Sequence, residues 1–324
     1  MSGPTIRPRR LRRSGAVRAL ARETHLAPSQ LVLPVFVREG ITEAQPILSM
    51  PGVVQHPLAE VGRLTARVAE AGLGGVMFFG VPETRDATGS GILDPEGILN
   101  RAIRAAVAEV GDATVIQADL CLDEFTNHGH CGVLDVRGEV DNDATLELYA
   151  RAAVAQAEAG AHLLGLSGMM DGQTAVARHA LDAAGHTEVG LLAYSAKYAS
   201  ALYGPFREAV DSPLRGDRRS YQLDPANGRE GLREAALDVA EGADIVMVKP
   251  ASFYLDVLAE VAAESPVPVW AYQVSGEYAM IEAAAANGWI DRRRAIDESV
   301  ISIRRAGADA ILTYWALELA EWSR

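Results

Sequence analysis

Lysine is almost absent from this chain. Of the 30 Lys and Arg residues among its 324, only Lys197 and Lys249 are lysines, and the other 28 are arginines. A preference for arginine as the ordinary surface cation explains the excess of Arg, but it does not explain why lysine is kept at two positions. The arginine guanidinium stays protonated in proteins, whereas a lysine amine can lose its proton and become a nucleophile. The shortage of lysine therefore directs attention to these two residues.

Long hydrophobic runs are also lacking. No stretch approaches the ~18 consecutive apolar residues of a membrane span, and no apolar segment follows the N-terminal arginines as it would in a secretory signal. The net charge of −13 argues against nucleic-acid and anionic-membrane partners, because both require clustered cations. We therefore expect a cytoplasmic protein with neither partner, and its length fits one large domain or two small ones.

The N-terminal segment, residues 1–27, departs from this acidic balance. Its arginines are Arg7, Arg9, Arg10, Arg12, Arg13, Arg18 and Arg22. A disordered tail that binds nucleic acid is one interpretation. The apolar residues Leu11, Val17 and Leu20 interrupt the cations, which favours an arm that docks on a neighbouring subunit of a homo-oligomer. We expect residues 28–324 to form the catalytic domain.

Eight short apolar runs recur along the chain and predict eight strands. They are nearly continuously hydrophobic, as strands buried on both faces of a parallel sheet are. The runs span 31–37, 75–80, 114–122, 163–167, 189–195, 245–250, 267–273 and 310–315. Helical patterns lie between them, so the sequence predicts an α/β fold of the (β/α)8 TIM-barrel type. An open doubly wound sheet is the alternative, but no G-x-G-x-x-G motif follows the first run.

A repeated junction supports the same fold. Gly72, Gly160, Gly242 and Gly307 each follow a helical pattern and precede an apolar run. A glycine at this position is typical of the residue just past a helix C-terminus. Self-similarity of this kind indicates repeated βα units.

Active sites of such barrels form at the carboxyl ends of the strands. Chemically unusual residues gather at the ends of the predicted strands: Cys121, Ser167, Lys197, Lys249, Tyr272, Ser275 and Tyr314. We therefore expect a site at this end of the barrel.

Both lysines lie in this group. Lys249 ends an apolar run and Lys197 lies just past the preceding one, so neither resembles a solvated surface cation. A purely structural ion pair is the alternative, but arginine would form it at least as well. A primary amine can form a Schiff base with a ketone, and burial together with a second cation lowers its pKa. We interpret both lysines as imine-forming residues.

A long polar segment, residues 211–229, follows the fifth run. It holds Arg215, Arg218 and Arg219, which together with Arg207 can bind carboxylates through paired hydrogen bonds. Loops of this length in a compact domain are usually functional, and we interpret this one as a lid that closes over the site. An ordinary solvated loop is the alternative.

The chain has two cysteines, Cys121 and Cys131, and in a cytoplasmic protein such a pair indicates metal or redox chemistry more than a disulfide. Asp123 lies between them, and His128 and His130 are close by. Two thiolates favour Zn²⁺, whereas a carboxylate is a harder ligand. Two reduced thiols in a loop are the alternative.

Six motifs occur in order along the chain: Ser-Ala-Lys197-Tyr-Ala-Ser, Tyr-Gly-Pro-Phe-Arg207, Gly-Asp-Arg218-Arg219-Ser-Tyr-Gln, Met-Val-Lys249-Pro, Val-Ser275-Gly-Glu and Gly-Ala-Asp-Ala-Ile-Leu-Thr-Tyr314. With them the chain resembles the porphobilinogen synthase (delta-aminolevulinic acid dehydratase) family over essentially its whole length. The resemblance implies a (β/α)8 barrel with an extended N-terminal arm, assembled as an octamer. It also implies a hydro-lyase of heme biosynthesis, which condenses two 5-aminolevulinate molecules to porphobilinogen with loss of two waters.

The resemblance implies a role for each residue of the site. Lys249 would form the Schiff base with the first-bound substrate, at the P site, and Lys197 the imine at the A site. Asp119, counted with the lysines as catalytic, and Ser167 would line the reaction centre. The residues that would bind the substrates are Arg207, Arg218 and Gln222 at the A-site carboxylate, Ser275 and Tyr314 at the P-site carboxylate, and Tyr272.

The resemblance also implies two metal sites. Zinc-dependent members carry Cys-x-Cys-x7-Cys, whereas the middle position here is Asp123. We expect Cys121, Asp123 and Cys131 to hold Zn²⁺, and a metal-free site is the alternative. Glu234 matches a glutamate that binds an allosteric Mg²⁺ at a subunit boundary in some members, and a plain surface glutamate is its alternative.

Two other functions remain as alternatives. Another Schiff-base barrel lyase, similar to a class I aldolase, would need only one imine-forming lysine. A non-catalytic barrel that binds a keto acid would need neither the second lysine nor the cysteine segment. The paired lysines and the cysteine segment favour porphobilinogen synthase.

Overall fold

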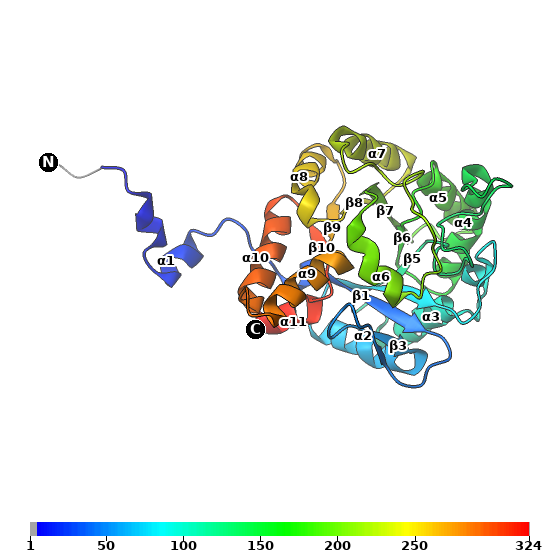
Figure 1. The fold of residues 1–324 in the computed structure, drawn as a ribbon, viewed down its shortest axis with the longest axis horizontal. Helices are drawn as coiled ribbons and strands as arrows, with labels where there is room; N and C mark the ends of the chain where they lie inside the picture. The colour runs from blue at the N-terminus through cyan, green and yellow to red at the C-terminus, as the bar shows by residue number, and fades with distance from the viewer. Residues whose placement is uncertain (1–4, 324) are drawn as a thin grey trace.

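The computed structural model describes residues 5–323 and forms a closed parallel barrel surrounded by helices (Figure 1). The strands are β1 (Leu31–Arg38), β2 (Gln45–Pro46), β3 (Val54–Pro57), β4 (Gly75–Val81), β5 (Val115–Asp119), β6 (Leu163–Leu166), β7 (Gly190–Lys197), β8 (Ile245–Lys249), β9 (Val269–Tyr272) and β10 (Ala310–Leu312). The α-helices are α1 (Gly15–Leu20), α2 (Val61–Glu70), α3 (Ile98–Val110), α4 (Asn142–Glu158), α5 (Gln173–Ala183), α6 (Gly204–Ala209), α7 (Gly228–Glu241), α8 (Leu255–Glu264), α9 (Ser275–Ala286), α10 (Arg292–Arg305) and α11 (Ala316–Trp322). Short 3₁₀ turns are η1 (Pro8–Arg12), η2 (Pro28–Gln30), η3 (Leu58–Glu60), η4 (Ser90–Leu93), η5 (Ala201–Tyr203) and η6 (Ser252–Tyr254).

The barrel closes through its first and last strands. β1 pairs in parallel with β4 on one side and with β10 on the other, where Leu31 is opposite Ile311. Between them β4 to β10 pair in chain order, each parallel to the next. The eight strands predicted from the apolar runs are all present, and the closed sheet confirms the (β/α)8 barrel and excludes the open doubly wound sheet.

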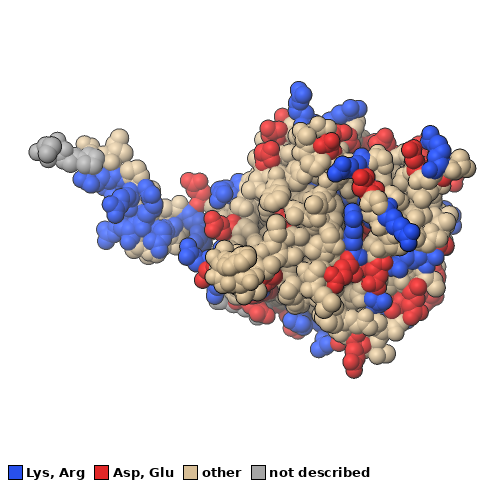
Figure 2. Space-filling model, viewed as in Figure 1, with Lys and Arg blue, Asp and Glu red and all other residues tan. Residues whose placement is uncertain are grey.

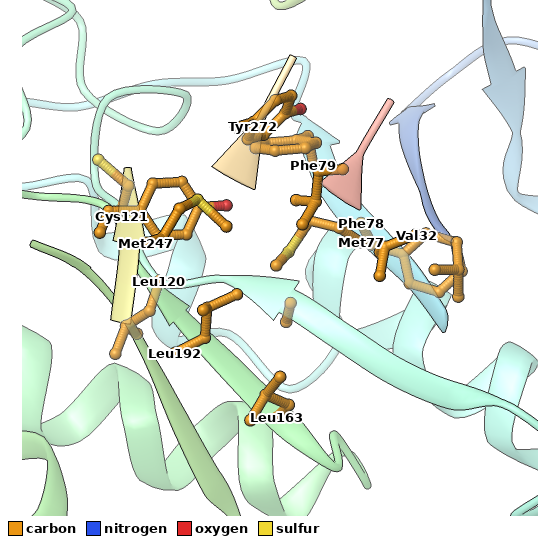
Figure 3. Packing of buried hydrophobic residues seen from close by; sticks show 14 of the residues in the cluster. Val32, Met77, Phe78, Phe79, Leu120, Cys121, Leu163, Leu192, Met247 and Tyr272 are labelled. Atoms are coloured by element: carbon orange, nitrogen blue, oxygen red, sulfur yellow. The ribbon is translucent and has the colours of Figure 1, made fainter. Parts of the chain in front are cut away.

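The interior of the barrel is a packed apolar core. Figure 3 shows Met77, Leu192 and Met247, from β4, β7 and β8, among its buried side chains, and all three are fully buried. Removing apolar surface from water contributes roughly 25 cal/mol per Å², so this core is the main source of the barrel's stability. Because the interior is filled, room for a ligand is left at the ends of the strands.

The predicted junction glycines all adopt backbone angles that other residues avoid. Gly72, Gly160, Gly242 and Gly307 have φ of 72°, 100°, 106° and 117°. A Cβ is strongly disfavoured at such angles, and glycine adopts them freely. The prediction that each glycine ends a helix and leads into a strand is confirmed.

Two details differ from the sequence prediction. β7 continues past the predicted end of its run to Lys197, with a shift in its pairing to β8 between Ala193 and Ala196. A small hairpin of β2 and β3 was not predicted, because β3 is short and only partly apolar. It extends the sheet beside the end of β1, where Phe36 is opposite Gln55.

The N-terminal segment projects from the barrel in Figure 1, and Figure 2 shows cationic side chains gathered along it. Neither η1 nor α1 contains a buried residue, and Leu11 and Leu20 are 61% and 90% exposed. Residues 1–4 of the predicted arm lie outside the described residues. Among residues 5–323, no helix combines the length and the hydropathy that a membrane crossing requires.

Candidate active site

A cavity of about 500 Å³, counting its open mouth, lies at the carboxyl end of the barrel. It is lined by Phe79, Asp119, Asp123, Ser167, Lys197, Tyr203, Phe206, Arg207, Arg218, Lys249, Tyr272, Val274, Ser275 and Tyr314. These include the three residues predicted to be catalytic, all but one of those predicted to bind substrate, and one predicted metal ligand. Sequence reasoning assigned no role to Phe79, Tyr203, Phe206 and Val274, since apolar and aromatic side chains carry little chemical signal of their own.

The two lysines end neighbouring strands. Lys197 is the last residue of β7 and Lys249 the last of β8, and they are directly opposite each other in the strand pairing. Both are buried, at 4% and 6% exposure. The Lys249 amine lies 4.3 Å from the centre of the Tyr272 ring and 4.9 Å from that of Tyr194. The ring of Tyr194 also lies 5.8 Å from the Lys197 amine, so one aromatic side chain contacts both.

Burial makes the Lys249 amine a weak base. Desolvation first, and the neighbouring positive charge of Lys197 second, lower the pKa of Lys249 to about 7. A large fraction of Lys249 is therefore unprotonated near neutral pH, which is the form that can attack a carbonyl carbon.

Asp119 lies within a short chain of polar contacts that leads to Lys197. Ser167 donates a hydrogen bond of 3.0 Å from its Oγ to Asp119 Oδ2, and the Lys197 amine donates to the carbonyl oxygen of Ser167. Burial, and then the negative charge of Asp123, raise the pKa of Asp119 to about 7. Among the described residues, Asp119 Oδ1 has no hydrogen-bonding partner. This carboxyl group can thus give or take a proton near neutral pH.

The cysteine segment forms a compact cluster beside this cavity. One potential ligand atom from each of Cys121, Asp123 and Cys131 lies within 4.8 Å of the other two, and all three residues are buried. Two thiols and a carboxylate suit a borderline-soft divalent ion such as Zn²⁺, so the residues present fit a metal. His128 and His130 do not join the cluster, since they hydrogen-bond to the Ala87 carbonyl oxygen and to the Tyr221 hydroxyl instead.

The cluster is held by partners that the sequence did not indicate. The Tyr149 hydroxyl donates to the Cys131 carbonyl oxygen and lies 3.7 Å from the Cys121 sulfur. Glu124 is buried with one carboxylate oxygen unpartnered among the described residues, and burial raises its pKa well above the usual value. Tyr149 and Glu124 therefore contribute to the buried surroundings of the cysteine cluster.

Burial and nearby positive charges shift the pKa values of the cluster residues. Arg218 forms an ion pair of 2.7 Å with Asp123, and it donates a hydrogen bond of 2.8 Å to the Gly129 carbonyl oxygen. Burial opposes ionisation of Asp123, but Arg218 and Lys197 outweigh it and hold the pKa of Asp123 below its usual range. Burial raises the pKa of Cys121. For Cys131, the hydrogen bond from Cys121 and the charge of Arg218 overcome burial and lower the pKa.

The predicted lid follows α6, which lies across the mouth of the barrel in Figure 1. Its buried arginine is Arg218, whereas Arg215 and Arg219 are exposed. The base of the segment is fixed by an ion pair of 2.6 Å between Asp211 and Arg38. The segment therefore packs on the cysteine cluster through Arg218, and Arg207 from α6 lines the same cavity.

Gln222 and Glu234 lie elsewhere. Both line a second, polar cavity behind the lid, which they share with Asp171 and Asp238. Gln222 is buried, and its Nε2 has no partner among the described residues. Burial, followed by the charges of Asp238 and Asp171, raises the pKa of Glu234. The family resemblance implied that Gln222 lies with Arg207 and Arg218 at the A site, whereas here it lines this second cavity.

The fold and the cavity define a (β/α)8-barrel enzyme with two buried amines at its mouth. The family model described as delta-aminolevulinic acid dehydratase matches residues 5–322. The chain is 62% identical over 323 residues to the delta-aminolevulinic acid dehydratase of Mycobacterium tuberculosis, covering 99% of this chain and 98% of that protein. It is 61% identical over 325 residues to that of Streptomyces coelicolor, covering 100% and 98%.

A solved structure agrees with these sequence matches. The delta-aminolevulinic acid dehydratase of Toxoplasma gondii, crystallised with the reaction product porphobilinogen, superimposes with a TM-score of 0.95 at 42% identity, covering 98% of this chain and 92% of that one. The chain belongs to the delta-aminolevulinic acid dehydratase family. It is an enzyme of the hydro-lyase class with porphobilinogen synthase function, and the aldolase-like and non-catalytic alternatives are excluded.

Proposed function

We propose that the chain joins two molecules of 5-aminolevulinate through imines on Lys249 and Lys197. Each amine would attack the ketone of one substrate and release one water as the imine forms. Carbon–carbon and carbon–nitrogen bond formation between the two substrates would then free both lysines, so that two substrates give porphobilinogen and two waters. The observation that carries this proposal is the direct opposition of two buried amines on β7 and β8.

The surroundings of Lys249 support its role as an imine-forming residue. Burial lowers the pKa of Lys249 to about 7 and so favours its uncharged amine, which lies 4.3, 5.6 and 5.6 Å from the ring centres of Tyr272, Tyr203 and Phe206. Holding both substrates covalently in one partly closed cavity makes their condensation effectively unimolecular, which removes much of its entropic cost.

The two sides of the cavity offer different groups to the substrate carboxylates. On the Lys197 side, Arg207 and Arg218 carry positive charge, and a guanidinium can bind a carboxylate through two parallel hydrogen bonds. On the Lys249 side, the hydroxyls of Tyr272 and Tyr314 lie 3.3 Å apart, and Ser275 is close by. We assign the A site to the arginines and the P site to the hydroxyls. Gln222 would reach the A site only if the lid rearranged.

Asp119 is assigned to proton transfer. Its pKa of about 7 lies near the working pH, which is where a general acid or base is most effective. Its contact with Ser167 links it to the Lys197 amine, so it can take the proton that the nitrogen loses after attacking the ketone and return it to the oxygen that leaves as water.

Cys121, Asp123 and Cys131 are the residues that would hold Zn²⁺. A zinc ion at this cluster would act as a Lewis acid on an oxygen of the A-site substrate. Arg218 pairs with Asp123, so Arg218 and a bound metal would share one carboxylate. We also assign Mg²⁺ to the second cavity at Glu234. Among the described residues no set of three close ligand atoms includes Glu234, so such an ion would take its remaining ligands from waters or from a partner subunit.

We propose that the protein is a cytoplasmic homo-oligomer, an octamer as in the family resemblance, and that residues 1–27 form its intersubunit arm. The exposed apolar side chains of Leu11 and Leu20 support this, because a neighbouring subunit would cover them. A nucleic-acid or membrane partner is not proposed.

Reduction with borohydride in the presence of 5-aminolevulinate tests the mechanism. We expect mass spectrometry to find substrate attached to Lys249, since reduction turns the imine into a stable amine. Lys249→Arg keeps the positive charge but removes the nucleophile, and it should lose nearly all activity. The absence of an adduct on both lysines, or a Lys249→Arg enzyme that keeps most of its activity, would contradict the proposal.

A further inference from the structure

Glu277 is a buried carboxylate in α9 that lies outside the cavity lining. It is 2% exposed and accepts three backbone hydrogen bonds. One comes from the N–H of Val274, at 2.6 Å, just before its own helix. The other two come from Ser252, at 2.6 Å, and Ala251, at 3.3 Å, which follow the neighbouring strand β8.

The bond to Val274 is an ordinary helix N-cap interaction, in which a glutamate of the first turn satisfies a free N–H group. The bonds to Ala251 and Ser252 do not cap α9, because these two residues follow β8 and lie outside that helix. They fix the chain two and three residues past Lys249, at the point where β8 leaves the barrel. A buried carboxylate that receives charge-assisted hydrogen bonds holds these groups more firmly than a neutral acceptor would.

The same helix turn also holds the other side of the Lys249 pocket. Ser275, two residues before Glu277, accepts a hydrogen bond of 2.9 Å from the Phe206 N–H, and its hydroxyl donates to the Leu202 carbonyl oxygen at 3.3 Å. Gly276 between them allows this approach, because a Cβ there would lie 2.5 Å from the Leu202 oxygen. Glu277 therefore joins the chain that follows Lys249 directly to the helix start bearing Ser275.

We propose that Glu277 is a positioning residue for the Lys249 half of the site. By binding the backbone that follows Lys249 and the N-terminus of α9 at once, it sets the distance between the imine-forming amine and the hydroxyl groups that receive the carboxylate of the same substrate molecule. This inference rests on the proposed roles of Lys249 and Ser275.

Two substitutions separate this role from simple helix capping. Glu277→Gln keeps the length of the side chain but replaces one acceptor oxygen by an NH₂ donor, which would face an N–H group. Glu277→Asp keeps the charge and should still reach Val274 at the start of its own helix, but its shorter side chain should lose the bonds to Ala251 and Ser252. If the bonds across to β8 matter, Asp should behave like Gln. If only the cap matters, Asp should behave like the wild type.

Glu282→Gln is the matched control. Glu282 is also a mostly buried glutamate of α9, and its partners are Arg292 and the Trp315 indole, at 2.7 Å each, away from the cavity. Its substitution should lower the melting temperature through the same loss of a buried hydrogen-bonded charge. The KM for 5-aminolevulinate and the rate of borohydride trapping on Lys249 should stay unchanged.

The experiment compares these full-length enzymes in three measurements: steady-state kinetics, the rate of borohydride trapping on Lys249, and amide hydrogen exchange in the peptide containing Ala251 and Ser252. We expect Glu277→Asp and Glu277→Gln to raise KM and slow trapping at least tenfold, with faster exchange at 251–252. Trapping and KM within twofold of wild type in Glu277→Asp would overturn the inference, whatever its melting temperature.

A failure of the imine mechanism would look different. In that case the wild type itself would give no adduct on Lys249. The exchange rates and KM of the Glu277 variants would still report whether Glu277 fixes this part of the site: unchanged exchange at 251–252 and unchanged KM would overturn its role independently.

Discussion

At the scale of single residues, the chemistry depends on how far the protein shifts a few proton equilibria. Lys249 has its pKa lowered to about 7 by burial and by Lys197, and Asp119 has its pKa raised to about 7 by burial and by Asp123. An ordinary lysine would be almost fully protonated at this pH, and an ordinary aspartate almost fully ionised. The structure thus brings a base and an acid to the same working range from opposite directions.

This shift predicts a pH dependence for imine formation. The amine of Lys249 attacks only when unprotonated, so the rate of borohydride trapping should rise with pH and level off above about 7. Removing the neighbouring charge with Lys197→Met should raise the pKa of Lys249, and the midpoint should move to higher pH. Trapping on Lys249 should be followed by mass spectrometry from pH 5.5 to about 10, a range chosen to bracket both midpoints. A wild-type midpoint above about 9, or no shift in Lys197→Met, would contradict this account.

The lowered pKa of Lys249 also makes the stability of the folded protein depend on pH. Because the unfolded chain keeps lysine protonated up to its ordinary pKa, the folded state binds fewer protons between about pH 7 and that value. Stability from this group is therefore lowest below about pH 7 and increases as the pH rises through that window. The buried amine costs the fold stability at the pH where it is most useful to the reaction.

The cysteine cluster predicts a change in metal affinity. Asp123→Cys would supply three thiolates, which are softer ligands for Zn²⁺ than a carboxylate, so the affinity should increase about tenfold or more. Asp123→Asn, which lacks the anionic ligand, should weaken binding. Competition with a chromophoric chelator measures both, and Co²⁺ substitution reports thiolate ligation from its absorption bands. Equal affinity in all three proteins would mean that residue 123 is not a ligand.

At the scale of elements, the helix–strand junctions set how tightly each βα unit packs. Gly307 ends α10 at φ 117°, and a Cβ there would lie 2.5 Å from that of Ala262 in the neighbouring α8. Gly72 ends α2 at φ 72°, and a Cβ there would meet nothing within 4 Å. Both junctions have a positive φ that a residue with a Cβ avoids, but they differ in packing.

These two glycines give a matched pair of substitutions. Gly72→Ala should destabilise the protein by about 1 kcal/mol through backbone strain alone. Gly307→Ala adds a steric conflict between two helices and should cost about 1–3 kcal/mol more. Chemical denaturation, or the melting temperature at one protein concentration, measures the difference. If the two variants unfold alike, the close contact of α10 with α8 is not significant for stability.

At the scale of the whole molecule, the barrel and the N-terminal segment have opposite character. The barrel buries a continuous core, whereas Leu11 and Leu20 are exposed on η1 and α1. Isolated helices of this length are only marginally stable in water, so we expect α1 to pack against another protein surface. The acidic whole chain and its arginine-rich arm are complementary in charge, which favours docking of the arm on another copy.

A double substitution in the full chain tests this arrangement. Leu11→Glu with Leu20→Glu places charges on the apolar face of the arm and should reduce the number of subunits per particle, measured by light scattering after gel filtration. Val136→Glu is the control, because Val136 is fully exposed on a loop of the barrel and its substitution should leave the assembly unchanged. An unaltered mass for the double variant would show that these arm residues make no essential contact between subunits.

Much of this molecule was predictable from the amino-acid sequence. Eight apolar runs, each too hydrophobic for a half-exposed strand, predicted the barrel, and the glycines at four helix–strand junctions marked its repeats. The retention of lysine at 197 and 249 indicated the site, because a lysine amine can form an imine with a ketone and an arginine guanidinium cannot. Signals of this kind can be detected in the sequence, because they depend on the residue types and their local order and not on contacts between distant segments.

The tertiary structure alone decided which groups meet. Nothing in the sequence placed Arg218 on Asp123, moved Gln222 into a second cavity, or surrounded Lys249 with Tyr203 and Phe206. These contacts join segments far apart in the chain, and they depend on the pairing of strands and the packing of loops over the mouth. The pKa of Lys249 is a property of that arrangement: burial and a second charge set it, and both exist only once the barrel has closed.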